Sequence, residues 1–328
     1  NRDHMQKLAF TTALTLLAVP AFAQDGEECG EISITEMNWA SASVVTNVAS
    51  FIMQQGYGCD VSIVPSDTVP AVTSVAENGE PDIVTELWTN ATGEVYDRLK
   101  AEGSVVELGA VLDPGGVDAW WIPAYLAEEH PELTTIDGVL QNPELVGGRF
   151  HNCPEGWGCR VFNDNLLPAF GVADAGIEIF NHGSGETLAA SIGSAFENEE
   201  PWFGYYWAPT AVIGRYDMVQ VDMGDYDREA HEAAQNPDAS DVGRTSFPPA
   251  PVSTAVTSSF SEEYPELTEF LSRMTFKTED MNAILSWMDD NSASGEEGAA
   301  YFLTNYPDTW SSWLNESAAE RLSAVLQQ

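Results

Sequence analysis

The first part of the chain alternates between strand-like and helix-like spacing of apolar residues. Residues 31–36 alternate apolar with polar positions and predict a strand, while residues 41–55 repeat apolar positions at helical spacing until Gly56 ends the helix. A strand, a helix and a strand are then predicted over 61–64, 69–76 and 82–87. This order is typical of a parallel sheet with crossover helices, whose ligands bind beyond the carboxyl ends of the strands.

The same pattern returns after Asp113-Pro114-Gly115-Gly116, a turn-forming sequence that predicts a break. An apolar stretch over 119–122 follows the break directly. The next elements are predicted as strand, helix, strand, helix and strand over 145–150, 161–170, 177–180, 187–197 and 202–207. These residues predict a second lobe with a sheet of its own.

A proline-rich segment, Phe247-Pro248-Pro249-Ala250-Pro251, predicts a second break. Only helices are predicted beyond it, over 262–273, 278–289, 296–305 and 309–328. Two breaks and a returning chain predict an α/β clam-shell protein, in which each lobe is a mostly parallel sheet flanked by helices and the chain crosses the hinge twice. The predicted parts are lobe 1 over 24–116, lobe 2 over 117–247 and a return to lobe 1 over 248–328.

The N-terminal residues predict export. Residues 1–4 are interpreted as the remnant of an expression vector, because Met5 offers a natural start. Residues 5–23 combine a short positive region, an apolar run and small residues before Gln24, which predicts a secretory signal peptide cleaved after Ala23. No later stretch has about 18 successive apolar residues, the length that spans a bilayer. We therefore expect the mature protein in the periplasm.

The composition excludes some partners. Lys and Arg number 12 against 52 Asp and Glu, and the resulting net charge of −40 repels nucleic acid and anionic membranes. With 44% hydrophobic residues, the 328-residue chain is nevertheless expected to fold. The excess acid is interpreted as an aid to solubility in salt-rich water, with attraction of a cationic ligand as the alternative.

Four cysteines in an exported chain favour disulfides over free thiols. Of the three possible pairings, we favour Cys153 with Cys159, which closes a short Gly- and Pro-containing loop. Cys29 then pairs with Cys59 and ties the first strand to the second. A metal site is the alternative, although the spacing matches no zinc motif.

Tryptophan placement gives the main chemical indication. Several of the 10 tryptophans follow a predicted strand end, follow the first break or lie in the cysteine-closed loop: Trp39, Trp88, Trp120, Trp121, Trp157 and Trp207. Indoles gathered in an interlobe cleft would form an aromatic cage that suits a methylated onium group. The alternative for each one is an ordinary core or surface aromatic residue.

Cation–π contacts alone do not account for tight binding. Each ring contributes about 0.5–2 kcal/mol, whereas micromolar affinity needs about 8 kcal/mol. A second group on the ligand, most simply a carboxylate, must therefore be held. The N–H groups of Ala40 and Ser41, at the start of the first helix, are one candidate. Further candidates from lobe 2 are Arg149, His151, Asn152 and Trp157, for which exposed or capping roles are the alternative.

Motifs for catalysis are missing from the sequence. It contains no nucleophile elbow, no metalloprotease helix motif and no phosphate-binding loop that ends in Gly-Lys-Ser/Thr. We therefore expect neither enzymatic activity nor a cofactor or a metal.

Several segments resemble the substrate-binding proteins of ABC importers for glycine betaine, choline and related osmolytes. They are Met37-Asn38-Trp39, residues 82–90, Tyr206-Trp207-Ala208-Pro209 and residues 301–307 with Trp310 and Trp313. The resemblance covers nearly all of the mature chain. It implies the two-lobe fold of periplasmic binding proteins and an aromatic box formed by Trp39, Trp88, Trp207 and either Trp120 or Trp121.

The sequence departs from the choline-type pattern at two places. Ser41 replaces an acid that would bind a hydroxyl group, and the lobe 2 loop is closed by Cys153 and Cys159. Both departures favour a carboxylate-bearing ligand, such as a glycine betaine-like compound or dimethylsulfoniopropionate. The resemblance implies a monomeric carrier that delivers this zwitterion to the membrane permease of an ABC importer. A sensory binding protein for the same ligands and an exported enzyme that acts on an onium compound are the alternatives.

Overall fold

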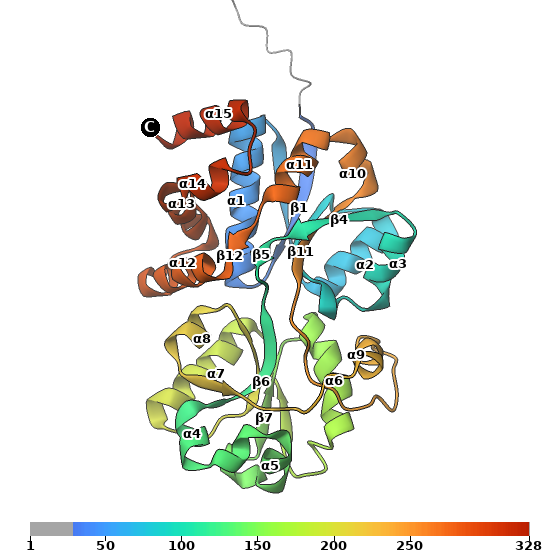
Figure 1. Ribbon diagram of the computed structural model, residues 1–328, viewed down its shortest axis with the longest axis vertical. Helices are drawn as coiled ribbons and strands as arrows, with labels where there is room; N and C mark the ends of the chain where they lie inside the picture. Colours follow the sequence, from blue (N-terminus) through green and yellow to red (C-terminus); the bar gives the residue numbers. More distant parts are fainter. Residues whose placement is uncertain (1–28, 328) are drawn as a thin grey trace, which may run out of the picture.

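Two five-stranded sheets, each flanked by helices, form two lobes in the computed structural model, which describes residues 29–327 (Figure 1). The two-lobe α/β prediction is confirmed. The predicted remnant over 1–4 and the predicted signal peptide over 5–23 lie outside the described residues. None of the described helices is long and apolar enough to cross a membrane.

Lobe 1 contains the sheet β2-β1-β3-β11-β4. Its strands are β1 (Glu31–Met37), β2 (Asp60–Ser66), β3 (Ile83–Trp88), β4 (Val105–Ala110) and β11 (Val252–Thr257). Its helices are α1 (Ala40–Tyr57), α2 (Thr68–Asn78), η1 (Thr89–Ala91), α3 (Gly93–Ala101), α10 (Ser258–Glu263), α11 (Pro265–Arg273), α12 (Thr278–Asn291), α13 (Gly295–Asn305), α14 (Pro307–Ser311) and α15 (Glu316–Leu326). The C-terminal helices lie beside α1, so the end of the chain completes the lobe that its beginning started (Figure 1).

Lobe 2 contains the sheet β10-β6-β9-β7-β8. Its strands are β6 (Val117–Pro123), β7 (Arg149–Asn152), β8 (Glu178–Asn181), β9 (Gly204–Ala208) and β10 (Met218–Gln220). Its helices are α4 (Ala124–Glu129), η2 (Pro131–Thr134), α5 (Ile136–Gln141), η3 (Pro143–Val146), α6 (Gly158–Phe170), α7 (Gly185–Asn198), α8 (Ala211–Arg215) and α9 (Arg228–Ala234).

Both sheets are mixed rather than mostly parallel. The strands β1, β2 and β3 pair in parallel, but β11 enters from lobe 2 and runs antiparallel between β3 and β4. In lobe 2, β7 is parallel to β8 and β9, whereas β6 is antiparallel to β9 and β10. In each sheet, the strand that follows a hinge crossing breaks the parallel pattern.

The prediction of only helices beyond 251 was wrong at β11, which fills an internal and fully buried position in its sheet, and at the two-residue strand Phe276–Lys277. Three other predicted elements are interrupted. The strand over 145–150 begins only at Arg149, because Gly147 and Gly148 have left-handed backbone angles. Pro265 starts a new helix within 262–273, and Asn315 caps a new helix within 309–328.

The chain crosses between the lobes twice, and the two crossings pair with each other. Gly116 N–H donates to the carbonyl of Ala250 at 2.9 Å, and Ala250 N–H donates back to Gly116 at 3.1 Å. Short strands β5 (Leu112–Asp113) and β12 (Phe276–Lys277) pair beside this point on the lobe 1 side. The two connections therefore form one double-stranded link.

Both predicted disulfide pairings are present. Cys29 and Cys59 immediately precede β1 and β2, so their bridge ties together the starts of two paired strands. Cys153 and Cys159 close the loop between β7 and α6, with Trp157 inside it. The described chain has no free cysteine.

Trp310 in α14 is a core residue of lobe 1. Its ring is 2% exposed and its Nε1 donates to the carbonyl of Leu303 at 2.9 Å. We expect Trp310→Ala to lower the free energy of unfolding by about 3–5 kcal/mol, because it leaves a cavity and an unpaired carbonyl. Urea denaturation followed by circular dichroism measures this loss, and a change below 1 kcal/mol contradicts a core role.

Candidate functional site

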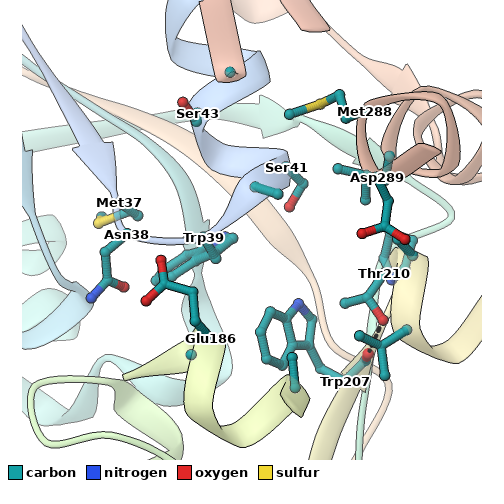
Figure 2. Close-up of a pocket in the computed structure, with 18 of the residues that line it drawn as sticks. Met37, Asn38, Trp39, Ser41, Ser43, Glu186, Trp207, Thr210, Met288 and Asp289 are labelled. Carbon is teal, nitrogen blue, oxygen red and sulfur yellow. Dashed lines mark hydrogen bonds between the residues drawn. The ribbon is translucent and has the colours of Figure 1, made fainter. Parts of the chain in front are cut away.

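A cleft of about 910 Å³ lies between the lobes, where the segments that follow β1, β2 and β9 meet (Figure 2). This is where ligands bind to sheets of this kind, beyond the carboxyl ends of parallel strands. The charged side chains that line it are all acidic: Glu36, Asp67, Glu186 and Asp289. Burial raises the pKa of Asp67. The cleft therefore favours a ligand with positive charge.

The start of α1 faces this cleft, and Ala40 and Ser41 both line it. The first N–H that bonds back along the chain is that of Ser43, which donates to the Trp39 carbonyl at 3.1 Å. The earlier N–H groups of the helix have no intrahelical acceptor, and they carry the positive end of the helix dipole. This end of the helix suits an anionic group of a ligand.

Five aromatic residues form a small cage that adjoins the cleft. Trp39, Trp88, Trp157, Tyr205 and Trp207 line a cavity of about 40 Å³, and three of them also line the larger cleft. Trp157 meets Trp39 edge to face at 5.6 Å between ring centroids and Trp207 at 5.1 Å. Tyr205 and Trp207 lie nearly parallel, with centroids 6.4 Å apart. We call these five residues the aromatic cage.

Two glycines let cage rings approach the backbone closely. A Cβ atom on Gly116 would lie 2.2 Å from Cη2 of Trp88, and one on Gly185 would lie 2.9 Å from Cη2 of Trp157. A larger residue at either position would displace its ring. The hinge crossing and the start of α7 therefore both shape the cage.

Asp118 is a buried carboxylate in the cage wall. It accepts hydrogen bonds from the Tyr205 hydroxyl and from Nδ2 of Asn90, the latter at 3.3 Å. Burial raises the pKa of Asp118 to about 6, although both hydrogen bonds act to lower it. At neutral pH the cage therefore contains a mostly ionised carboxylate.

Glu86 is a second buried carboxylate, located behind the cage. Its Oε1 accepts hydrogen bonds from Nε1 of Trp39 and from the Ser41 hydroxyl, both at 2.6 Å. Nε1 of Trp88 lies 3.5 Å from the same oxygen. Burial raises the pKa of Glu86 to about 7, against the lowering effect of these hydrogen bonds.

The two lobes touch on both sides of the cleft. On one side, Trp157 Nε1 from lobe 2 donates to Oδ1 of Asn38, and Val69 N–H donates to the Gly156 carbonyl at 3.4 Å. On the other side, Arg215 of α8 forms ion pairs with Asp289 and Asp290 of α12. Trp157 is thus both a cage residue and an interlobe contact.

Trp120 and Trp121 point away from the cleft. Trp120 is fully buried among Phe150, Phe170 and Phe203, and its Nε1 donates to Asn163 at 3.0 Å. Trp121, on the opposite face of β6, donates to the Tyr206 carbonyl at 2.9 Å. Neither residue lines the cleft or the cage cavity.

Arg149, His151 and Asn152 also lie outside the cleft lining. Arg149 pairs with Glu178 on the surface of the sheet, and His151 stacks between Trp202 and His182. Burial lowers the pKa of His151 to about 3, so this ring is neutral.

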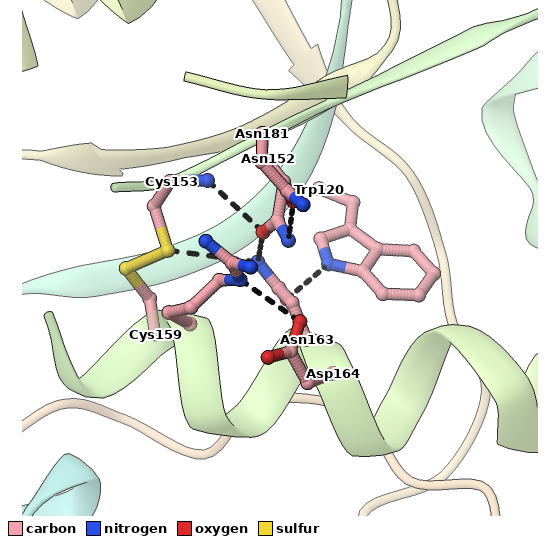
Figure 3. Close-up of polar contacts among 8 residues, drawn as sticks. Trp120, Asn152, Cys153, Cys159, Asn163, Asp164 and Asn181 are labelled. Carbon is pink, nitrogen blue, oxygen red and sulfur yellow. Dashed lines mark hydrogen bonds and ion pairs between the residues drawn. A yellow bond between two sulfur atoms is a disulfide. The ribbon is translucent and has the colours of Figure 1, made fainter. Parts of the chain in front are cut away.

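Asn152 belongs to a buried network beside the Cys153–Cys159 disulfide (Figure 3). Its Oδ1 accepts hydrogen bonds from Asn163 at 2.7 Å and from the Cys153 N–H at 2.9 Å, while its Nδ2 donates to Asn181 at 2.9 Å. This network fixes the base of the loop that carries Trp157.

Sequence reasoning missed Glu86, Asp118 and Tyr205. Glu86 and Tyr205 each stand two residues before a cage tryptophan, Trp88 and Trp207, and this spacing was the one available signal for them. Asp118 stands two residues before Trp120, which lies outside the cage, so no such signal existed for it. Nothing in the sequence distinguishes Glu86 and Asp118, the two acids that are buried within residues 29–327, from the other acidic residues.

A family model described as the substrate-binding domain of the ABC-type glycine betaine transport system matches residues 30–305. The chain belongs to this family. Membership confirms the resemblance seen in the sequence and the prediction of a binding protein without enzymatic activity. A comparison with curated proteins found no significant match.

Solved structures with the same fold include other binding proteins. A choline-binding protein in complex with choline is 18% identical, with a TM-score of 0.74 over 92% of this chain and 100% of that one. The glycine betaine/L-proline-binding protein of Borrelia burgdorferi is 17% identical, with a TM-score of 0.73 over 89% and 99%. The lactococcal protein in its closed form with glycine betaine is 20% identical, with a TM-score of 0.68 over 87% and 100%.

The interlobe role of Trp157 can be tested in the ligand-free binding protein. We expect Trp157→Ala to increase the radius of gyration measured by small-angle X-ray scattering, because it removes the interlobe bond to Asn38 and the interlobe edge-to-face contact with Trp39. Trp287→Ala is the control, since Trp287 stacks on Tyr301 within lobe 1. Equal radii for wild type and Trp157→Ala at 20 °C would contradict the assignment.

Proposed function

We propose that this binding protein captures a zwitterionic onium compound between its lobes and delivers it to the membrane permease of an ABC importer. Family membership supports the binding role and the importer. The ligand class is inferred from the aromatic cage, which combines rings from both lobes with the buried carboxylate of Asp118. A glycine betaine-like compound or dimethylsulfoniopropionate is the proposed ligand.

The cage suits the onium end of such a ligand. A methylated ammonium or sulfonium centre has no strong hydrogen-bond donor, so contact with ring faces replaces its hydration. The nearby carboxylate of Asp118 adds Coulombic attraction, which its burial strengthens. Of the sequence candidates, Trp39, Trp88, Trp157 and Trp207 belong to this proposed site, whereas Trp120 and Trp121 do not.

The carboxylate end would extend from the cage into the cleft. Trp39, Trp157 and Trp207 line both spaces, so a ligand held by its onium end reaches the cleft directly. The start of α1, at Ala40 and Ser41, provides N–H groups there. The start of α7, at Gly185 and Glu186, lines the same cleft from the other lobe. Arg149, His151 and Asn152 are not part of this proposal.

A hydroxyl-bearing cation of the choline type is the second candidate. The acidic lining of the cleft favours it, because Glu36, Asp67, Glu186 and Asp289 would repel a ligand carboxylate. Such a ligand would need only a hydrogen-bond acceptor for its hydroxyl group. The two candidates differ in one functional group and are separated by a direct comparison of affinities.

The proposal also covers the cellular location, the oligomeric state and the partner of the protein. We infer export by the predicted signal peptide and action as a monomer in the periplasm. Residues 24–116 and 248–328 are assigned to lobe 1, and residues 117–247 are assigned to lobe 2. A sensory partner for the same ligand is the alternative to a permease.

Isothermal titration calorimetry with a panel of ligands tests the ligand class. We expect glycine betaine or dimethylsulfoniopropionate to bind with a Kd of roughly 1 µM or below, and choline to bind at least about tenfold more weakly. Carnitine and proline betaine complete the panel. The reverse order would replace the zwitterion with a choline-type ligand, and heat from none of them would remove the proposed function.

Substitutions within the cage test its role. We expect Trp39→Ala, Trp88→Ala and Trp207→Ala each to cost about 1–3 kcal/mol of binding free energy for the best ligand, because ring contact and cation–π attraction are lost. The corresponding Phe variants should cost less. Trp287→Ala, outside both cavities, serves as the control, and thermal melts check folding. Wild-type affinity in all three Ala variants is incompatible with the cage as the binding site.

A further inference from the structure

Glu86 occupies an unusual position in β3. It is the only residue of that strand with a left-handed backbone, at φ +47°, a conformation that side-chain-bearing residues seldom adopt. The pairing with β11 shifts here: Leu87 pairs with Ser253 and Val84 with Ala255, so β3 has an extra residue at this point. Such bulges redirect a side chain, and strain of this kind is retained where the surrounding structure requires it.

The redirected side chain holds two cage residues at once. A single oxygen, Oε1, accepts from Trp39 and Ser41 at the start of α1 and faces Trp88 Nε1 at the end of its own strand. Trp39 and Trp88 come from different elements, and this oxygen fixes the orientation of one indole relative to the other. A carboxylate bonded to an indole N–H also makes the ring a better partner for a cation.

No positive charge compensates this carboxylate. Glu86 is fully buried, makes no ion pair, and its Oε2 has no hydrogen-bond partner within residues 29–327. Of the elements packed on β3, α1 and β11 carry no ionisable side chains except Tyr57 at the far end of α1. The titratable groups of β1 and α2 are acids, Glu31, Glu36 and Glu77, and Asp118 lies in the cage. Helix α3 packs on β3 through Tyr96 and Leu99, but its Arg98 and Lys100 are solvent-accessible and pair with other acids, Glu102, Asp97 and Glu107. A buried carboxylate of this kind is costly unless a cation approaches it.

We propose that Glu86 determines the specificity of the cage: it orients Trp39 and Trp88 and supplies the negative charge that makes the site select a cationic centre over an uncharged group of the same shape. This inference rests on the proposed function, since it concerns the same ligand. Because Glu86 acts through the two indoles and lines neither cavity, it is a positioning residue. The onium centre is the cation that the uncompensated carboxylate lacks.

The Glu86→Gln variant separates charge from shape. The amide oxygen still accepts hydrogen bonds from Trp39 and Ser41, whereas the negative charge is lost. Two probes make the comparison: glycine betaine, and 3,3-dimethylbutanoate, in which a neutral carbon replaces the ammonium nitrogen. We expect the affinity of Glu86→Gln for glycine betaine to fall at least about tenfold at pH 8, while its affinity for 3,3-dimethylbutanoate stays within twofold of wild type. Glu31→Gln, which removes one charge from the neighbouring strand, is the matched control.

The pH dependence provides a second readout. Glu86 binds a proton near pH 7 in the free protein and an onium favours its ionised form, so wild-type affinity should rise as pH increases through about 7. Asp118 titrates near pH 6 and contributes its own step, which Asp118→Asn removes. In Glu86→Gln, the step near pH 7 should disappear and the step near pH 6 should remain.

The outcomes distinguish the two proposals. If Glu86→Gln weakens both probes equally, Glu86 has only a structural role and the inference is overturned. It is also overturned if affinity for glycine betaine and its pH profile are unchanged. If wild-type protein binds no onium compound, the proposed function fails. Tryptophan fluorescence of the ligand-free protein then still tests Glu86: we expect a transition near pH 7 in wild type that Glu86→Gln lacks, and an identical transition in both excludes contact between this carboxyl and the indoles.

Discussion

An indole N–H that is removed from water needs a hydrogen-bond acceptor, and one carboxylate oxygen is that acceptor for the two cage tryptophans of lobe 1. Oε1 of Glu86 accepts a hydrogen bond from Nε1 of Trp39, and Nε1 of Trp88, at the end of β3, points to the same oxygen. The extra residue in β3 and the first turn of α1 are both arranged around this oxygen. Since β11 is the partner against which β3 bulges, the return of the chain from lobe 2 also contributes to it. The geometry of the cage therefore originates in the core of lobe 1.

The other half of the cage depends on lobe 2. Trp157 is held by a loop with a disulfide and an asparagine network at its base, and Trp207 ends a buried central strand. Trp88, which belongs to lobe 1, packs on Gly116 where the chain leaves for lobe 2. Ring positions on the two sides are thus coupled through the hinge as well as through direct contact. A binding site divided in this way is complete only when the lobes are together.

The sequence predicted the parts of the fold that follow simple periodicity. The first five elements were predicted because their strands lie between helices and are bounded by turns, whereas β11 was hidden by the prolines that precede it. Trp120 and Trp121 could not be distinguished because β6 is buried on both faces, so hydrophobicity does not alternate along it. Glu86 and Asp118 were missed for a different reason, since burial of an acid depends on tertiary packing and leaves no local pattern. Trp157 joined the cage only through the folding of its loop.

The paired crossings at Gly116 and Ala250 have a mechanical consequence. Because the two connections are joined by reciprocal backbone hydrogen bonds, a change of backbone angles in one of them acts on the other as well. Such a linked hinge favours movement of the lobes as rigid bodies over independent displacement of either connection. The rings that each lobe contributes to the cage would then move as two sets, each of which keeps its internal arrangement.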